Sequence, residues 1–127
     1  MERISGSRNY FQIIFNPTSA SELAAMPREL QLEILGQFKG VVEESPAGFG
    51  TLEKGRQTLH RYRVGNYRIY FERHALGVVV HRILSKNTLR DFFFRNVRMN
   101  SDEDEVLAEN PKFWKMIEEA AQASRPS

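Results

Sequence analysis

The chain has 127 residues, which is enough for one domain with a hydrophobic core and too few for two domains of ordinary size. It contains no cysteine, which excludes disulfides, thiolate nucleophiles and cysteine-based metal sites. The net charge of +2 combines −3 over residues 1–53, +9 over residues 54–98 and −4 over residues 99–127, so a basic block that suits a polyanionic partner lies between two acidic segments.

A strand and two helices are expected first along the chain. Tyr10–Phe15 is rich in strand-forming residues and ends at an Asn-Pro turn signal. Ser19 and Glu22 have the spacing of a capping box, which predicts a short helix that starts near Ser19 and ends before Pro27. Apolar residues then recur three or four positions apart over Arg28–Glu43, which predicts an amphipathic helix packed on a core.

Three strands are predicted in the middle of the chain. Residues 45–57 contain several glycines and are expected to form a loop. Thr58–Val64 and Tyr67–Arg73 are then predicted strands, joined by a tight Gly-Asn turn, and Gly77–Leu84 is the last strand.

Alternation along the first two of these strands predicts a sheet with two different faces. Arg61 and Arg63 share one face, and Arg68 and Tyr70 share a face of the next strand. The opposite face receives bulky apolar and aromatic residues, which are expected in the core: Tyr62, Val64, Tyr67, Ile69 and Phe71.

Two of the three histidines lie in predicted strands. Alternation places His60 on the face opposite Arg61, and it places His81 opposite Arg82. We therefore interpret both as histidines in or beside the core, and His74 as an exposed turn residue. The spacing of the three histidines matches no metal-binding motif.

Two more helices are predicted after the strands. Asn87 or Thr88 can cap the first of them. The polar stretch Met99–Asp104 is expected to be a non-helical interruption between the two helices. Asn110 and the proline that follows it predict a final helix to about Ala121.

The resulting order is strand, two helices, three strands and two helices. It predicts an α+β fold with a small, mostly antiparallel twisted sheet, an N-terminal helical hairpin packed on one face, and a C-terminal helix. Residues 1–98 are expected to form the main domain. Residues 99–127 are expected to form an acidic linker and an amphipathic helix packed on or beside that domain.

Three segments carry a family resemblance: IIFNPTSASELAAMPRELQLEIL, YRVGNYRIYFE and VVVHRILSKNTLRDFFFR. With the element order, they resemble the RelE/ParE superfamily of bacterial toxins from toxin–antitoxin modules. The second segment is close to that family's Tyr-Arg-x-Gly-x-Tyr-Arg signature. The resemblance spans residues 10–98, so residues 1–98 are expected to be the toxin domain.

The resemblance implies one of two activities. RelE-like members cleave mRNA in the ribosomal decoding site, where the 2′-hydroxyl of the target nucleotide attacks its own 3′ phosphate. ParE-like members inhibit DNA gyrase without cutting. We expect mRNA cleavage. The alternatives are gyrase inhibition and an inactive RelE-fold protein that binds nucleic acid or an antitoxin. The implied partners are a cognate antitoxin and mRNA on the ribosome, and no metal or organic cofactor is implied.

Basic residues on the strands are implied to hold the scissile phosphate. Arg61, Arg63 and Arg68 match the family's basic strand positions, and Arg68 follows Tyr67 at the place where the family carries its transition-state arginine. A guanidinium group suits a phosphate bidentately and stabilises its developing charge. Further nucleic-acid contacts are predicted for Lys54, Arg56, Tyr70, Arg82, Lys86 and Arg90.

Two positions depart from the cleaving pattern. Asn87 stands where cleaving members often carry an arginine, and Phe93 stands in the Phe-Phe pair where they often carry a tyrosine. Phenylalanine cannot exchange a proton, so the proton-transfer group is missing or lies elsewhere.

The acidic segment Ser101–Glu109 carries five acidic residues and no basic one. We expect a solvated connector whose following helix docks Phe113, Trp114 and Ile117 on the domain's own apolar surface. The alternative is that the segment lies across the arginines and competes with nucleic acid, because the charges are opposite.

The N-terminal sequence MERISGSRNYFQIIF lacks the apolar stretch of a signal peptide. No apolar run approaches the roughly 18 residues that a membrane span needs. The sequence therefore predicts a cytoplasmic protein with no membrane partner.

Overall fold

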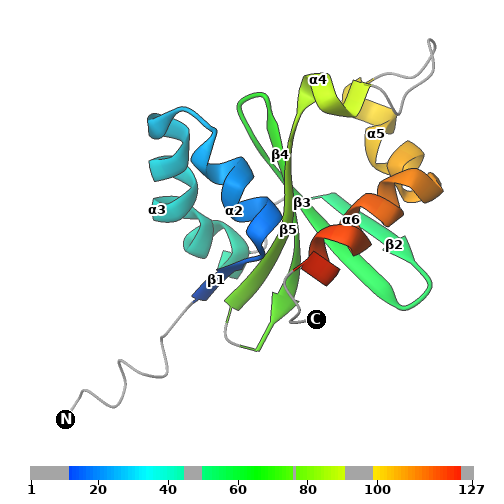
Figure 1. Cartoon of the computed structure of the whole chain (residues 1–127), viewed down its shortest axis with the longest axis horizontal. Coiled ribbons are helices and arrows are strands. Elements are labelled where there is room, and N and C mark those ends of the chain that lie inside the picture. The colour runs from blue at the N-terminus through cyan, green and yellow to red at the C-terminus, as the bar shows by residue number, and fades with distance from the viewer. Residues whose placement is uncertain (1–11, 45–49, 76, 91–98, 124–127) are drawn as a thin grey trace.

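The protein folds around a five-stranded mixed sheet with helices against both faces, as the computed structural model shows (Figure 1). The structure describes residues 12–44, 50–75, 77–90 and 99–123. The expected α+β fold is confirmed. None of the helices in these ranges is long and apolar enough to cross a membrane.

The sheet has the strand order β1-β5-β4-β3-β2. Neighbouring strands are antiparallel, except that β1 is parallel to β5. The strand bounds are β1 Gln12–Phe15, β2 Gly50–Lys54, β3 Gln57–Val64, β4 Tyr67–His74 and β5 Gly77–Ser85.

Strand β2 lies in the segment 45–57 that was predicted to be a loop, and that prediction is wrong for residues 50–54. The glycines of this segment favoured a loop, but residues 50–54 form a five-residue strand in which Leu52 is buried directly opposite Leu59 of β3. By contrast, the tight turn between β3 and β4 is confirmed. Gly65 occupies it with a φ of +58°, a conformation that glycine adopts without steric cost.

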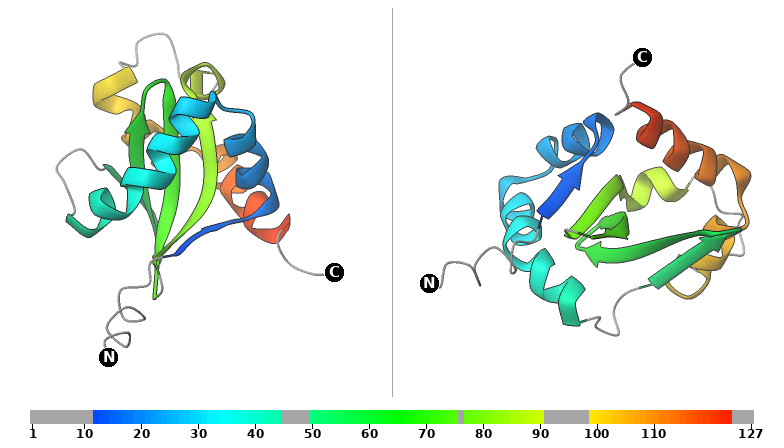
Figure 2. Two further views of the ribbon diagram at one scale, coloured as in Figure 1. Left: turned by 90° about the vertical axis from the view of Figure 1, so that its left-hand side faces the viewer. Right: turned by 90° about the horizontal axis from the view of Figure 1, so that it is seen from below.

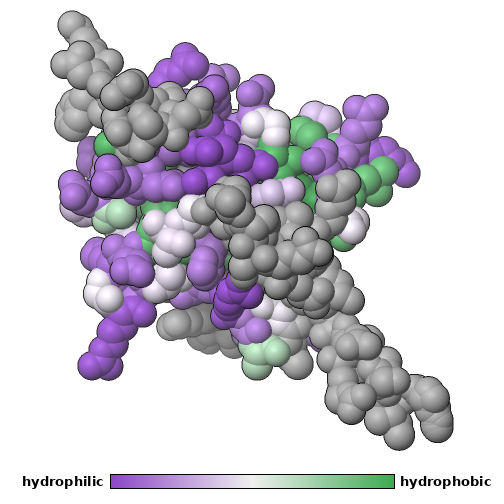
Figure 3. Space-filling model, turned by 180° about the vertical axis from the view of Figure 1, so that it is seen from behind, coloured by the Kyte–Doolittle hydropathy of each residue, from purple (hydrophilic) through white to green (hydrophobic). Residues whose placement is uncertain are grey.

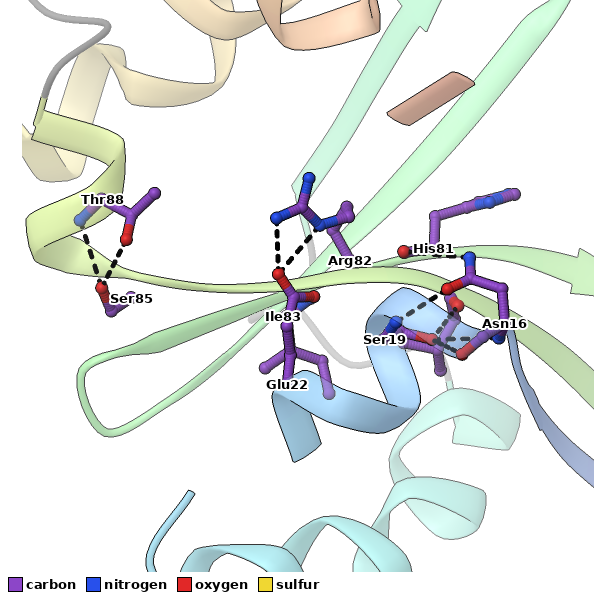
Figure 4. Close-up of polar contacts among 9 residues, drawn as sticks. Asn16, Ser19, Glu22, His81, Arg82, Ile83, Ser85 and Thr88 are labelled. Carbon is purple, nitrogen blue, oxygen red and sulfur yellow. Dashed lines mark hydrogen bonds and ion pairs between the residues drawn. The ribbon is translucent and has the colours of Figure 1, made fainter. Parts of the chain in front are cut away.

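Helix α2 (Pro17–Ala24) is capped by Asn16, not by Ser19 as predicted. The Asn16 side chain accepts a hydrogen bond from the Ser19 N–H at 2.7 Å, and the Ser19 hydroxyl accepts one from the Asn16 N–H at 3.1 Å. Pro17 opens the helix, where its missing N–H costs nothing. Both cap side chains also donate to backbone carbonyls of β5, at His81 and Val80, so the cap ties α2 to the sheet (Figure 4).

The first face of the sheet is covered by α2 and α3 (Arg28–Glu44) (Figure 2). Phe38 of α3 stacks on Tyr62 and meets Phe71 edge to face, with ring centroids 5.8 and 4.9 Å apart. The expected core positions on β3 and β4 are therefore confirmed. We call this cluster the first core; its buried residues are Met26, Ile34, Phe38, Val64, Ile69, Phe71, Val78, Val80 and Ile83.

The opposite face is covered by α5 (Met99–Ala108) and α6 (Pro111–Ala123) (Figure 2). We call the apolar cluster here the second core; its buried residues are Leu52, Leu59, Tyr70, Leu84, Leu89, Leu107, Phe113, Trp114 and Ile117. The prediction that Met99–Asp104 is a non-helical interruption is wrong, because these residues belong to α5. Asn110 accepts a hydrogen bond from the Lys112 N–H at 2.9 Å at the start of α6, as expected.

Helix α4 (Lys86–Leu89) follows β5 directly. Ser85 caps it by accepting a hydrogen bond from the Thr88 N–H at 3.1 Å, so the prediction of Asn87 or Thr88 as the cap is wrong (Figure 4). Phe93, which stands where the cleaving pattern often has a tyrosine, lies outside the described residues.

The surface seen from behind is mostly hydrophilic (Figure 3). The large hydrophobic side chains that stay exposed among the described residues are Leu32 and Leu35 of α3.

Candidate functional site

The three arginines predicted to bind phosphate lie together on the sheet face below α5. Arg63 pairs directly with Arg68 across β3 and β4, and Arg61 pairs with Tyr70 two residues along. Three guanidinium groups from two neighbouring strands thus form one surface, which we call the arginine face.

Two carboxylates of α5 occupy the arginine face. Arg61 donates from Nε to Asp104 Oδ1 at 3.0 Å and from Nη2 to Oδ2 at 2.7 Å. Arg68 donates to both oxygens of Glu103, at 3.0 and 3.4 Å, and Arg63 Nη2 lies 3.7 Å from the same carboxylate. Such forked pairs match two guanidinium nitrogens to two oxygens and are among the strongest hydrogen bonds in proteins.

The Arg68–Glu103 pair is buried, and the Arg61–Asp104 pair is partly buried. Arg61 and Arg68 keep 5% and 2% of their surface exposed, and Glu103 keeps 1%. The expectation of a solvated connector is therefore wrong for this part of the acidic segment, which lies across the arginines. The expected docking of the apolar side of α6 is confirmed by the burial of Phe113 and Trp114 in the second core.

Gly50 makes room for one of these pairs. It lies opposite Arg61 in the register of β2 and β3. A Cβ atom at this position would overlap both the Arg61 guanidinium and the Asp104 carboxylate. A side chain at position 50 would therefore force the Arg61–Asp104 pair to shift.

The pKa values on this face follow from burial and from the two carboxylates. Burial alone would lower the pKa of Arg61, but the hydrogen bond and the charge of Asp104 outweigh it and raise the pKa above its usual value. Burial, followed by the charges of Glu103 and Asp104, raises the pKa of the Tyr70 hydroxyl well above its ordinary range. Neither side chain is suited to accept a proton at neutral pH.

Tyr70 was predicted to contact nucleic acid. It does share the face of Arg68, but it is fully buried and meets Phe113 edge to face at a centroid distance of 5.1 Å. Its ring is therefore inaccessible while α6 is docked, because Phe113 packs against it.

The other predicted nucleic-acid contacts have different surroundings. Arg82 donates to Glu22 of α2 at 2.9 and 2.5 Å, which fixes α2 against β5 (Figure 4). Lys86 and Arg90 line a hollow of about 530 Å³ beside the β3–β4 turn. Lys54 is exposed at the end of β2, and Arg56 is exposed in the turn that follows.

His81 is a residue that the alternation rule misplaced. Arg82 pairs with Tyr70 while Val80 pairs with Phe71, so His81 is left over at a register shift and the alternation ends there. His81 Nε2 lies 2.7 Å from Glu72 Oε1, and its ring lines a cleft of about 850 Å³ that α6 helps to form. No local pattern marks such a bulge, so sequence reasoning had no signal for it.

His60 lies where it was predicted. Its ring packs against Phe71 of the first core, on the face opposite the arginines, with centroids 5.4 Å apart. Burial, followed by the charge of Arg73, lowers the pKa of His60 below the ordinary value of 6.5. His60 is thus a core-side residue and takes no part in the arginine face.

No family model and no curated protein matches this sequence. Two solved structures are similar in fold at low identity. The toxin–antitoxin complex RelBE2 of Mycobacterium tuberculosis has a chain with 18% identity and a TM-score of 0.48, covering 59% of this chain and 96% of its own. The RelB–RelE antitoxin–toxin complex of Methanococcus jannaschii has a chain with 23% identity and a TM-score of 0.47. This match covers 64% of the present chain and 99% of the matched chain.

Proposed function

We propose that the protein is a RelE/ParE-like toxin that binds RNA phosphate on its arginine face and cleaves mRNA at the ribosome. One observation carries the proposal. Arg61, Arg63 and Arg68 converge from two neighbouring strands and hold two oxyanions. Carboxylates and phosphates are bound by the same planar fork of guanidinium donors, so a site built for one geometry also suits the other.

The proposed chemistry uses these donors as electrostatic catalysts. The 2′-hydroxyl of the target nucleotide gives its proton to water and attacks the adjacent phosphorus, which forms a 2′,3′-cyclic phosphate. The bond to the 5′-oxygen of the next nucleotide breaks, that oxygen takes up a proton from water, and negative charge builds on the phosphate oxygens in between. Arg61 and Arg68, held in place by their strands, would meet that charge without reorganising. Arg63 has a side chain that is 33% exposed and would contact the entering strand.

The proton acceptor is not supplied by the arginine face itself. Arginine stays protonated in proteins, and the raised pKa of Tyr70 keeps its hydroxyl protonated. This observation favours a second candidate function, a ParE-like inhibitor of DNA gyrase or an inactive RelE-fold protein that binds nucleic acid or an antitoxin. A cognate antitoxin is the proposed partner in every case.

Mapping of mRNA 5′ ends after brief induced expression tests the two candidates. The wild type is compared with Arg68→Ala, with Arg68→Lys, which keeps the charge and loses the fork, and with Arg28→Ala, an exposed control on α3. Cleavage predicts new ends in register with the reading frame for the wild type and the control, and none for Arg68→Ala. Circular dichroism must show that each variant is folded.

Because α5 covers the arginine face, the same mapping is made with Glu103→Gln/Asp104→Asn, in which the covering charges are gone. No new ends from either the folded wild type or this folded variant would contradict the mRNA-cleaving function. DNA damage without new RNA ends in both proteins would identify the gyrase inhibitor instead.

A further inference from the structure

We propose that α5 and α6 act as a built-in competitor of nucleic acid. Glu103 and Asp104 occupy the phosphate positions of the arginine face, and this segment must move away before RNA can bind there. The inference rests on the proposed function and adds its regulation: the closed form is the inactive state of the toxin.

The first step of the argument is charge matching. Asp104 takes the fork of Arg61, and Glu103 bridges Arg68 and Arg63. Two carboxylates thus neutralise most of the charge of three arginines, and they do so at the nitrogens that a phosphate would need. RNA and α5 cannot use these donors together, so their binding is mutually exclusive.

The second step concerns the kind of contact. A buried ion pair gains little over apolar side chains of similar size, because both charges lose their hydration. An apolar residue at position 103 would close the face equally well against an apolar partner. Carboxylates on arginines are instead expected at a surface that exchanges one anionic ligand for another.

The third step is that α5 and α6, which together form the cover of the arginine face, share no buried residue with the first core in the described part of the chain. Among the described residues, the buried members of the first core all come from β3, β4, β5 and the helical hairpin, and none comes from α5 or α6. The sheet can therefore keep that core when the cover leaves. Displacement of the cover exposes the apolar side of α6 to water. The free-energy cost of this exposure opposes opening.

Trp114 reports the position of the cover. It is the only tryptophan of the chain, it is 4% exposed in the second core, and its indole N–H donates to the Ala108 carbonyl at 2.8 Å. Undocking of α6 transfers this indole to water. A red shift of its emission therefore measures opening directly, without any assay of cleavage.

The test titrates the full-length protein with a short fluorescein-labelled 2′-O-methyl oligouridylate, which cannot be cleaved, at fixed low salt. Binding is followed by anisotropy, and opening by Trp114 emission in parallel titrations with the unlabelled oligonucleotide. Glu103→Gln/Asp104→Asn should bind about 10- to 100-fold more tightly than the wild type, if the open state is populated at about 1–10%. RNA should also shift Trp114 emission of the wild type to the red over the same concentration range.

Two further variants separate competition from simple charge effects. Glu105→Gln/Glu109→Gln removes the same net charge from exposed positions in and just after α5, and it should bind RNA like the wild type. Gly50→Ala changes no charge but crowds the Arg61–Asp104 pair, and it should bind more tightly. If the double variant is poorly folded, Asp104→Asn alone should show a smaller gain, because that carboxylate is partly exposed.

The outcomes distinguish this inference from the proposed function. Equal or weaker RNA binding by a folded Glu103→Gln/Asp104→Asn, or saturation with no change in Trp114 emission, overturns the inference, even if the wild type cleaves mRNA. Tighter binding with the emission shift but without new mRNA ends supports the competitor and contradicts cleavage.

Discussion

The two faces of the sheet are closed by different kinds of contact. Under α2 and α3 the buried contacts of the first core are apolar and aromatic, with Phe38 between Tyr62 and Phe71. Under α5 and α6 an apolar cluster adjoins buried ion pairs, of which Arg68 with Glu103 is the most enclosed. Both covers are helical, so the contrast lies in the side chains that they bury.

This difference separates a face that is held by apolar packing from a face that also contains paired charges. Apolar burial stabilises a domain without needing a particular partner atom. A buried guanidinium needs an oxyanion, since burial of an unpaired charge is costly. The buried arginines of the second face therefore need an oxyanion, and any molecule that carries a suitable oxyanion can meet that need.

The largest effects are expected from one phenylalanine on each face. Phe38→Ala and Phe113→Ala each remove a fully buried ring, and each should cost about 3–5 kcal/mol in the free energy of unfolding. Urea unfolding is followed by far-ultraviolet circular dichroism and by Trp114 fluorescence. The two signals should coincide for Phe38→Ala, whereas for Phe113→Ala the fluorescence change should come first. Coincident transitions in both variants would show that the faces unfold as one unit.

The buried ion pair sharpens the comparison further. Glu103→Ala leaves Arg68 buried without its partner and should cost about 3 kcal/mol or slightly more. Arg68→Met/Glu103→Leu, which makes this face resemble the first core, should recover most of that loss. The exposed control Glu105→Ala should stay within about 0.5 kcal/mol of the wild type. A double variant as unstable as the single one would show that the pair itself stabilises the fold.

A smaller effect is expected where α2 joins β5. Asn16→Ala removes the cap of α2 and a buried hydrogen bond to the His81 carbonyl, and it should cost about 1–2 kcal/mol. Ser85→Ala removes an exposed cap of α4 and should cost about 0.5–1 kcal/mol. Urea midpoints measured side by side give the ranking, and the reverse order would contradict the role assigned to burial.

The smallest effect is a pH dependence from His60. Its folded-state pKa is lowered, so the folded protein holds the neutral ring while the unfolded chain takes up a proton around 6.5. Stability from this group is thus present above 6.5 and is lost as the pH falls through 6.5 toward the folded-state pKa. The urea midpoint of the wild type should therefore fall more between about pH 7.5 and about pH 5.5 than that of His60→Gln. Parallel pH profiles would contradict the assignment.

Local rules predicted much of the fold because they rest on neighbouring residues. Alternation placed His60 opposite Arg61, and it placed Phe71 in the core, since both lie in regular stretches of β3 and β4. His81 is buried, as expected, but the alternation rule fails there because one residue is left over in the pairing. The cap of α2 was misplaced by three residues, because Asn16 and Ser19 form a reciprocal pair in which either could be taken as the cap.

The chemistry of the arginines was readable from residues close together in the chain. Arg61, Arg63 and Arg68 lie on one hairpin, so their common face follows from strand alternation and one tight turn. Opposite charge suggested the acidic segment as a cover of that face only as an alternative, and it did not give the pairing of individual side chains. Glu103 and Asp104 lie 35 and 43 positions beyond the arginines that they bind, and no periodicity connects such distant residues. Their pairing is a property of how α5 docks on the sheet, because only packing brings charges so far apart in sequence into contact.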